Sequence, residues 1–438
     1  MAEHALRRNA LMQQMGSDSI AVLSAAPVAI KNNGIEYPYR QQSDFQYLSG
    51  FPESDAVLVL IPNRKHGEYI LFCKEKNVEQ ELWHGSLAGQ DDAVTLYGAD
   101  DAFPINDIDD ILPGLIEGKK RVYYSIGTDS EFDARLMDWV SSIRARVGRG
   151  AQPPGEFITL DYLLHDMRLY KSIDELGVIR RAAGISVKAH LRAMRVCQPG
   201  LYEFNLETEL NYEFGQGGAK HNAYNSIVAS GNNSCVLHYV NNDDRLTDGD
   251  LVLIDAGCEI ECYASDITRT FPVSGTFSTE QKAIYDLVLA AQEAAFSVVT
   301  PGKQWNDPHE QAIRVITEGL VALDLLQGDV PTLIASDAYK EFYMHRTGHW
   351  LGLDVHDVGE YKVANEWRVL EVGMVMTVEP GIYIAPNNLR VPEQWRGIGV
   401  RIEDDIVVTP NGYELLTVGL PRTTNEIEEL MSVSRIIS

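Results

Sequence analysis

The sequence predicts an α+β protein that begins with an α/β domain. Between Ile20 and Leu160, short apolar runs alternate with polar, helix-like stretches, which is typical of a sheet covered by helices. Beyond this part, strong helix signals and strand-like runs do not alternate strictly, which favours α+β over a doubly wound sheet. The 438 residues, 45% of them hydrophobic, are enough for roughly two to three domains with a large buried core.

Four apolar runs predict the strands of the N-terminal domain. The first, Ile20–Ile30, superficially resembles a signal peptide, but Asp18 before it and Pro27 within it favour a buried strand. The other three runs lie at residues 56–62, 69–73 and 122–127.

A break rich in Pro and Gly at residues 148–155 precedes the predicted domain boundary. The next strong helix signal follows at residue 172. We therefore assign residues 1–170 to the N-terminal α/β domain and residues 171–438 to a second domain.

Three helices of the second domain are predicted from their start signals. Ser172 and Glu175 have the Ser-x-x-Glu form of a capping box, and the helix that they open should end before Pro199. Ser278 opens a second helix that runs to about Val299. A third begins at residues 306–308 and runs to about residue 325. Strand-like runs rich in β-branched residues lie at residues 251–254, 266–273, 374–378 and 399–408.

Charge and cysteine content exclude several classes of partner. The chain has 37 basic and 63 acidic residues, and its net charge of −26 would repel nucleic acid and anionic lipid. No apolar run reaches the ~18 residues that a membrane-spanning helix needs. Five scattered cysteines, an odd number, are typical of a reduced, cytoplasmic protein. The C-x3-C pair Cys258 and Cys262 is interpreted as apolar side chains on a hairpin rather than as zinc ligands.

The first chemical signal is a strand that ends in a carboxylate, Leu251–Asp255, followed by a second strand-like run from Asp266. If Ile260 and Glu261 form the turn of a hairpin, the two aspartates become direct cross-strand neighbours with Cβ atoms ~4.5–5.5 Å apart. Two like charges at this separation destabilise a hairpin unless cations lie between them, and two divalent metals could be held there. The alternative is two exposed hairpin carboxylates.

Histidines supply the second signal, between His345 and His356. His345 and His349 have the His-x3-His spacing of a metalloprotease helix, but Arg346 stands where that motif needs Glu, and Gly348 weakens a helix. We interpret the stretch as a glycine-rich loop that presents His349 to a metal, with the other two histidines nearby. A histidine held in the core by hydrogen bonds is an equally good interpretation of the pattern.

Two further strand-like segments carry acidic residues. Glu379 precedes a Pro-Gly turn, and Glu403 follows Ile402 in the apolar part of its strand, so both are candidates for inward-facing side chains. Asp404 and Asp405 are expected to be solvated, and a solvated Glu403 fits the pattern equally well. The complete set of candidates is four carboxylates and one imidazole, mostly hard oxygen donors suited to Mn²⁺, Co²⁺ or Zn²⁺: Asp255, Asp266, His349, Glu379 and Glu403.

The order of these motifs resembles the creatinase/methionine aminopeptidase, or pita-bread, superfamily, and specifically its bacterial Xaa-Pro aminopeptidase (aminopeptidase P) family. The resemblance covers nearly the whole chain and implies that residues 171–438 form a pita-bread metallopeptidase domain. It departs from the family at Arg346 and Thr347, where Gly and a small residue are common, and at Cys262 and Ser265, which replace common glycines. The segments that carry it are Glu36–Phe45, Leu48–Phe51, Leu237–Tyr239, Asp255–Cys258, Asp266–Pro272, His349–Gly359, Val378–Tyr383 and Gly399–Asp404.

The resemblance implies a dinuclear metal centre. Asp255 would bind one metal, Asp266 and Glu403 would bridge both, and His349 and Glu379 would complete the second site. The cofactors would be two divalent ions, Mn²⁺ first, with Co²⁺ and Zn²⁺ as alternatives. The reaction would be metal-assisted hydrolysis of a peptide bond.

The resemblance also implies roles in catalysis and substrate binding. Glu379 would carry the proton to the departing proline nitrogen, His238 or His356 would bind the scissile carbonyl, and Arg401 would assist them. His345, Tyr383 and Trp83 would contact the substrate, with Trp83 reaching the active site of a neighbouring subunit. The N-terminal domain would then serve in oligomerisation and access to the active site, in a homodimer or homotetramer.

Peptides with proline at the second position are the substrates that this resemblance implies. A prolidase, which cleaves Xaa-Pro dipeptides and in some cases organophosphate esters, would share every ligand and remains an alternative. A second alternative is a non-catalytic peptide-binding module of the same fold. Neither nucleic acid nor a membrane is expected as a partner.

Overall fold

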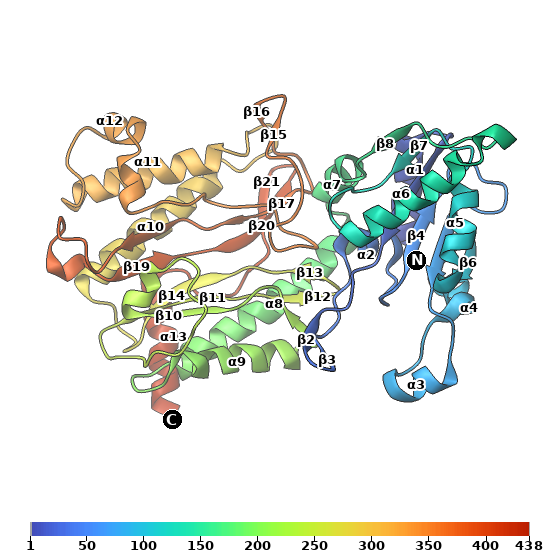
Figure 1. Ribbon diagram of the computed structural model, residues 1–438. Helices are drawn as coiled ribbons and strands as arrows, with labels where there is room; N and C mark the ends of the chain where they lie inside the picture. Colours follow the sequence, from blue (N-terminus) through green and yellow to red (C-terminus); the bar gives the residue numbers. More distant parts are fainter. Residues whose placement is uncertain (1, 438) are drawn as a thin grey trace. The chain divides into compact units, whose positions relative to one another are not determined.

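The structure is a computed structural model that describes residues 2–437. The chain forms two compact units that divide between Met167 and Arg168 (Figure 1). The boundary predicted at residues 170/171 lies three residues further along. Both units mix helices with strands, which confirms the predicted α+β class with an α/β domain at the N-terminus.

One six-stranded mixed sheet organises the N-terminal unit, in the order β6-β5-β4-β1-β7-β8. Strand β1 is the buried strand predicted near Ile20, and it pairs antiparallel with β4 and parallel with β7. The strands of this sheet are β1 (Ser19–Ser24), β4 (Val57–Leu60), β5 (Tyr69–Cys73), β6 (Asp101–Pro104), β7 (Arg121–Tyr123) and β8 (Glu156–Ile158). A separate hairpin consists of β2 (Ile30–Asn32) and β3 (Ile35–Glu36).

Alternate side chains of this sheet pack against two helices. Ile20 and Val22 of β1 share a buried apolar cluster with Leu112 and Leu136, which belong to α5 and α6. Both β1 residues point to the same face of the sheet, as period-two alternation requires.

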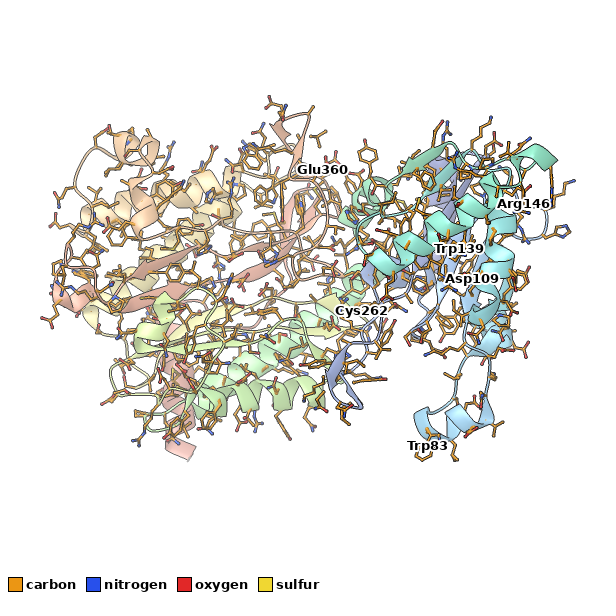
Figure 2. All side chains as sticks on the ribbon, in the orientation of Figure 1. Trp83, Asp109, Trp139, Arg146, Cys262 and Glu360 are labelled. Carbon is orange, nitrogen blue, oxygen red and sulfur yellow. The ribbon has the colours of Figure 1, made fainter. Side chains whose placement is uncertain are left out.

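Another helix, α3, carries Trp83, which is 76% exposed. Figure 2 shows this side chain at the end of a projecting segment. The helices that begin in this unit are α1 (Ala2–Met15), α2 (Ser43–Ser49), α3 (Val78–His84), α4 (Gly89–Thr95), α5 (Ile108–Ile116), α6 (Ser130–Arg144) and α7 (Asp161–Leu169).

The C-terminal unit contains several short antiparallel sheets. The sheets β10-β11-β14 and β17-β20-β21 matter most for the site, and an isolated bridge between Thr268 and Glu403 joins β14 to the residue before β20. The strands are β9 (His221–Asn222), β10 (Ile227–Ser230), β11 (Leu251–Asp255), β12 (Cys258–Ile260), β13 (Tyr263–Ala264), β14 (Thr268–Pro272), β15 (Lys362–Val363), β16 (Glu366–Trp367), β17 (Val375–Val378), β18 (Gly381–Ile384), β19 (Ile398–Arg401), β20 (Asp404–Thr409) and β21 (Gly412–Leu415).

Helices of the C-terminal unit begin where the sequence predicts them. Ser172 and Glu175 form the capping box of α8, and Ser278 forms a second one with Gln281 at the start of α10. The apolar faces of α8 to α11 share one large core with β11, β14 and β19. The helices are α8 (Ile173–Val196), α9 (Glu203–Gln216), α10 (Thr279–Ser297), α11 (Asp307–Ala322), α12 (Val330–Ala335) and α13 (Thr424–Ile437).

The strand predicted over residues 399–408 is in fact two strands. Strand β19 ends at Arg401, β20 begins at Asp404, and the two belong to different sheets. Asp404 and Asp405 are 0% exposed, so the prediction that they are solvated is wrong. Arg269 donates to Asp404 at 2.7 Å, and the backbone N–H of Asp266 donates to Asp405 at 3.0 Å. Both donors come from a distant part of the sequence, so the local pattern could not reveal them.

All five cysteines are thiols, with Cys258 buried on β12 and Cys262 partly exposed in the turn to β13. The pair is therefore part of a hairpin, as predicted. Within residues 2–437, none of the helices has the length and apolar character that crossing a bilayer requires.

Candidate metal centre and active site

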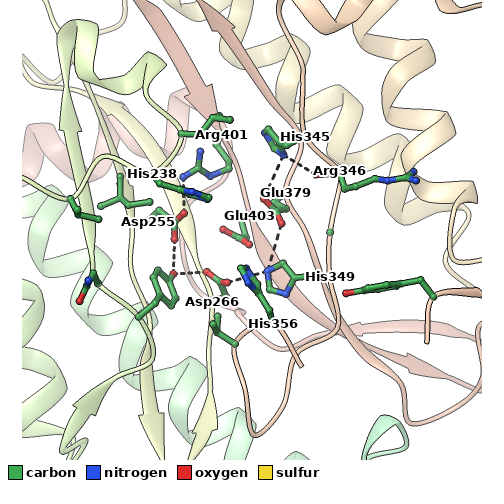
Figure 3. A pocket seen from close by; sticks show the side chains of 18 of the residues that line it. His238, Asp255, Asp266, His345, Arg346, His349, His356, Glu379, Arg401 and Glu403 are labelled. Carbon is green, nitrogen blue, oxygen red and sulfur yellow. Dashed lines mark hydrogen bonds and ion pairs between the residues drawn. The ribbon is translucent and has the colours of Figure 1, made fainter. Parts of the chain in front are cut away.

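A cavity of about 590 Å³ in the C-terminal unit contains the predicted metal ligands. Its wall also includes three of the predicted catalytic residues and one substrate-binding residue. Figure 3 shows the four carboxylates grouped at its centre, with the imidazole of His349 beside them. The predicted residues on the wall are His238, Asp255, Asp266, His345, His349, His356, Glu379, Arg401 and Glu403.

The register predicted for Asp255 and Asp266 is wrong. The turn of the β12–β13 hairpin lies at Glu261 and Cys262, one residue beyond the predicted turn, and both have positive φ angles of 52° and 68°. Asp255 consequently pairs with Thr268. The same register, continued toward the turn, places Asp266 opposite Gly257, where an added Cβ would overlap the Ser265 carbonyl oxygen. The two aspartates are therefore close without being direct cross-strand partners.

Tyr224 links the two aspartates instead. Its hydroxyl lies 2.5 Å from Asp255 Oδ1 and also contacts Asp266 Oδ1. The phenolic group has one proton to donate, so it satisfies one carboxylate at a time. Burial and the charges of the two aspartates raise the pKa of Tyr224 well above 10, so it stays protonated. Tyr224 could not be recognised from the sequence, since a lone tyrosine 31 positions before Asp255 has no local signal.

Glu403 enters the site through the break between β19 and β20. Its backbone N–H donates to Thr268 O at 3.0 Å, and its carboxylate accepts from the Thr268 hydroxyl at 2.6 Å. The side chain is 2% exposed. The bridge to β14 thus brings Glu403 next to Asp266, and the solvated alternative for Glu403 is excluded.

His349 lies in the glycine-containing loop that the sequence predicts, and not on a helix. Its backbone N–H donates to Thr377 Oγ1 at 3.1 Å, and its Nδ1 is 2.9 Å from Trp350 O. Because a carbonyl oxygen can only accept, Nδ1 carries the proton, and Nε2 faces the carboxylates. Nε2 lies 3.4 Å from Asp266 Oδ2 and 3.7 Å from Glu379 Oε1.

Crowding of like charges shifts the pKa values in this cavity. Burial and the charges of neighbouring carboxylates raise the pKa of Asp266 and raise that of Glu403 well above its usual range. Burial raises the pKa of Glu379 to about 7, although the charges of His349 and Arg401 oppose the change. For His349, burial lowers the pKa, but the hydrogen bond to Asp266 and the charge of Glu379 outweigh it and raise the value to about 9.

This donor set fits divalent metal ions. Ligand atoms of Asp266, His349 and Glu403 all lie within 4.8 Å of one another, and Asp255 and Glu379 border the same cavity. The carboxylates compete for protons because too few positive charges are near them, and a bound cation would relieve this repulsion. Oxygen donors with one imidazole suit Mn²⁺, Co²⁺ or Zn²⁺.

A chain of hydrogen bonds connects Asp255 to the histidine loop. Arg401 is 4% exposed and donates to Asp255 Oδ2 at 2.6 Å and to the Tyr383 hydroxyl at 2.8 Å. The Tyr383 hydroxyl lies 2.9 Å from His345 Nε2, and His345 Nδ1 lies 2.8 Å from Arg346 O. The carbonyl of Arg346 can only accept, so Nδ1 is protonated and Tyr383 donates to Nε2. Burial and the charge of Arg401 lower the pKa of His345 to about 3, which keeps it neutral.

The remaining predicted residues lie in different places. The ring of His356 packs edge-on against His349, with 4.4 Å between ring centroids, and His238 lies on the cavity wall. Trp83 belongs to the N-terminal unit, where it lies on α3. Residues that the sequence analysis did not connect with the site also line the cavity: Tyr224, Asn225, Trp305, Tyr361 and Trp367.

The chain joins an α/β N-terminal domain to a domain that has four carboxylates and one imidazole in a single cavity. This combination defines a metallopeptidase-like protein of two domains. Sequence comparison agrees with this class. The model of metallopeptidase family M24 matches residues 177–410, and the model of the aminopeptidase P N-terminal domain matches residues 4–123. The chain belongs to metallopeptidase family M24.

Full-length relatives share this architecture. The Xaa-Pro aminopeptidase of Escherichia coli strain K12 is 46% identical over 430 residues, which cover 98% of this chain and 97% of the relative. The structure of Pseudomonas aeruginosa aminopeptidase PepP superposes with a TM-score of 0.99 at 65% identity, covering 99% and 98% of the two chains. Zinc-substituted E. coli aminopeptidase P in complex with product superposes with a TM-score of 0.96 at 45% identity, covering 99% and 98%.

Proposed function

We propose that this protein is a metal-dependent aminopeptidase that releases the N-terminal residue from peptides with proline at the second position. The observation that carries the proposal is the single cavity that brings together Asp255, Asp266, His349, Glu379 and Glu403. Similarity over the full chain length to Xaa-Pro aminopeptidases supports this substrate class over other M24 activities. The five cysteine thiols support a cytoplasmic location, where thiols stay reduced.

Two divalent ions would be held by the five ligands, with Asp266 and Glu403 shared between them. We infer Mn²⁺ as the native metal, because carboxylate oxygens dominate the donor set; a zinc-substituted relative indicates that related sites also accept Zn²⁺. When bound, such ions lower the pKa of water and stabilise negative charge on a carbonyl oxygen.

Proton transfer is the role proposed for Glu379. Its carboxylate lies 3.7 Å from His349 and 3.8 Å from His345, at the edge of the carboxylate group. It would accept a proton from the attacking water and pass it to the proline nitrogen as the peptide bond breaks. His238 and His356, both on the cavity wall, would donate hydrogen bonds to the scissile carbonyl as negative charge develops on it.

Substrate orientation is the role proposed for the hydrogen-bond chain. Arg401 donates to the Tyr383 hydroxyl, which donates in turn to His345. Burial and the charge of Arg401 keep the pKa of His345 low, so its ring stays neutral. These groups give a fixed wall against which a proline ring can pack. A proline nitrogen brings no N–H, so a site without an acceptor for it accepts proline without leaving a polar group unpaired.

We further propose that Trp83 contacts the active site of a neighbouring subunit in a homodimer or homotetramer. Its ring is 76% exposed and lies on the short helix α3 beside Leu82, which is 82% exposed. Large exposed apolar side chains of this kind are typical of interaction sites. Sedimentation at working concentration should show an oligomer; a monomer would remove the role of Trp83 in a neighbour's site.

The test of the proposed activity compares three peptides on the Mn²⁺-loaded protein. We expect release of the first residue from Xaa-Pro-Xaa tripeptides, poor cleavage of Xaa-Pro dipeptides, and slow cleavage when alanine replaces proline. A preference for the dipeptide would indicate a prolidase. No cleavage of any peptide with metal bound would indicate a binding module.

A further inference from the structure

Arg346 is an unusual residue on the wall of the catalytic cavity. It stands where the family that this chain resembles often has glycine, and its side chain is exposed. Figure 3 shows it next to His345, with its guanidinium pointing away from the carboxylates. Its guanidinium therefore lies at the end of the cavity beyond His345, away from the proposed metal ligands.

Aromatic rings and an amide hold this guanidinium in place. Its Cζ lies 4.8 Å from the ring centroid of Trp367 and 5.7 Å from that of Trp305. Nη1 donates to Asn306 Oδ1 at 2.7 Å, and the amide of Asn306 is oriented by its own hydrogen bond to Glu310 at 2.7 Å. Stacking on aromatic rings orients the planar group but uses none of its in-plane N–H donors.

No carboxylate of residues 2–437 lies within 4.0 Å of the Arg346 guanidinium as an ion-pair partner. Nζ of Lys362 lies 4.3 Å from the ring centroid of Trp367, so two cations are grouped around this ring. A guanidinium that is held in a fixed orientation, with no carboxylate of the protein as its partner, is suited to bind a carboxylate of a ligand.

The direction of the substrate follows from the charges of the cavity. The α-ammonium of a peptide is attracted by the carboxylates and repelled by Arg346. The departing nitrogen must lie near Glu379, which would protonate it, and His345 lies 3.8 Å from Glu379. Arg346 is the next residue in the chain. The part of the peptide that follows the departing nitrogen therefore extends toward Arg346.

We propose that Arg346, with Trp305 and Trp367, forms a subsite for a carboxylate on the departing side of the substrate. The carboxylate belongs either to the C-terminus of a short peptide or to an acidic side chain after proline; both present the same planar group to the guanidinium. This inference rests on the proposed aminopeptidase function and adds a preference for short or acidic peptides.

The kinetic test uses three peptides that carry their carboxylate at the C-terminus, nowhere, or on the third side chain: Ala-Pro-Ala, its C-terminal amide, and Ala-Pro-Glu amide. We expect Arg346→Gln to lower kcat/KM about ten-fold for the peptide whose carboxylate binds, and by less than about two-fold for Ala-Pro-Ala amide. Loss with the free acid identifies the C-terminus, and loss with Ala-Pro-Glu amide identifies a side chain. Equal loss with all three peptides, or with none, would overturn the subsite.

Two variants control for charge and shape. Lys340→Gln removes an exposed cation that pairs with Asp337 outside the cavity, and it should leave all three rates as in the wild type. Arg346→Lys keeps the charge but loses the planar fork, so it should recover only part of the preference. Full recovery would show that charge alone matters, which contradicts an oriented subsite.

A binding test separates this inference from the proposed activity. Calorimetry on the metal-free protein should show that Pro-Ala binds more tightly than Pro-Ala amide, and that Arg346→Gln removes this difference while leaving the amide unchanged. If the metal-loaded protein cleaves no proline peptide but the calorimetric difference is found, the proposed activity fails and the carboxylate subsite stands. Equal binding of acid and amide to the wild type would refute the subsite directly.

Discussion

Replacing Glu379 with Gln should stabilise the metal-free protein at pH 8, although it removes a predicted metal ligand. Burial raises the pKa of Glu379 from 4.5 to about 7, and this value already includes the opposing charges of His349 and Arg401. The folded state therefore holds this proton more tightly than the unfolded state does. The contribution of Glu379 to the free energy of unfolding is most favourable below pH 4.5, and it is lost as the pH rises from there through 7.

The size of the effect follows from the two pKa values. The step from 4.5 to about 7 corresponds to a loss on the order of 3 kcal/mol in the free energy of unfolding above pH 7. Gln cannot ionise and escapes this loss. The substitution also removes a charge that helps to keep His349 protonated, which reduces the gain. We expect a net increase of about 1 to 3 kcal/mol for Glu379→Gln at pH 8.

Urea unfolding in a chelator, at pH 5 and at pH 8, measures this effect. The advantage of Glu379→Gln should be large at pH 8 and small at pH 5, and saturating Mn²⁺ should reverse the order by stabilising the wild type more. Glu318→Gln, at an exposed position on α11, controls for the loss of one carboxylate and should change little at either pH. A variant no more stable than the wild type at pH 8, or equally stabilised at both pH values, would refute the argument from charge.

Three further substitutions test other parts of the site. Glu403→Gln should abolish peptidase activity and lower the metal content found by elemental analysis while the fold is kept; near-normal turnover would contradict a shared ligand. His356→Ala should lower kcat by ~10²-fold or more with metal retained, and loss of metal would make it a ligand. Asp357→Asn should lower the free energy of unfolding in urea by about 3 to 5 kcal/mol, because the Asp357 side chain is 1% exposed and pairs with Arg168 at 2.5 Å and Lys171 at 2.8 Å; a loss below about 1 kcal/mol would contradict this.

Features that depend on residues close together in the sequence were predicted correctly. The capping boxes at Ser172 and Ser278 depend on residues three apart, and both helices begin where those residues predict. The five candidate ligands could be named because each lies in a short motif at the end of a strand or in a loop, and the structure brings them to one cavity. Recognition of the family joined these motifs, which spacing alone left with open alternatives.

Contacts between distant segments were the ones that the sequence missed. Tyr224 and the Arg269–Asp404 pair depend on strands and loops that meet only in the folded chain. The hairpin register failed for a related reason. A turn at Glu261 and Cys262 needs two residues with positive φ, and neither has the Asn-Gly chemistry that would have indicated this. At this turn, tertiary contacts outweigh the preference of Glu261 and Cys262 for negative φ angles.

The buried charges of this domain serve two different purposes. Arg269 is 0% exposed, pairs with Asp404, and also donates to the backbone oxygen of Glu403 at 2.7 Å. This arrangement fixes the backbone at the break between β19 and β20 without using the Glu403 carboxylate. The side chain of Glu403 is then free to remain among like charges, at a cost that the rest of the domain must offset. The carboxylates of a site that binds cations strongly must be poorly neutralised when no cation is bound. Arg269 fixes the backbone beside Glu403 without neutralising the Glu403 carboxylate, so the excess negative charge stays in place.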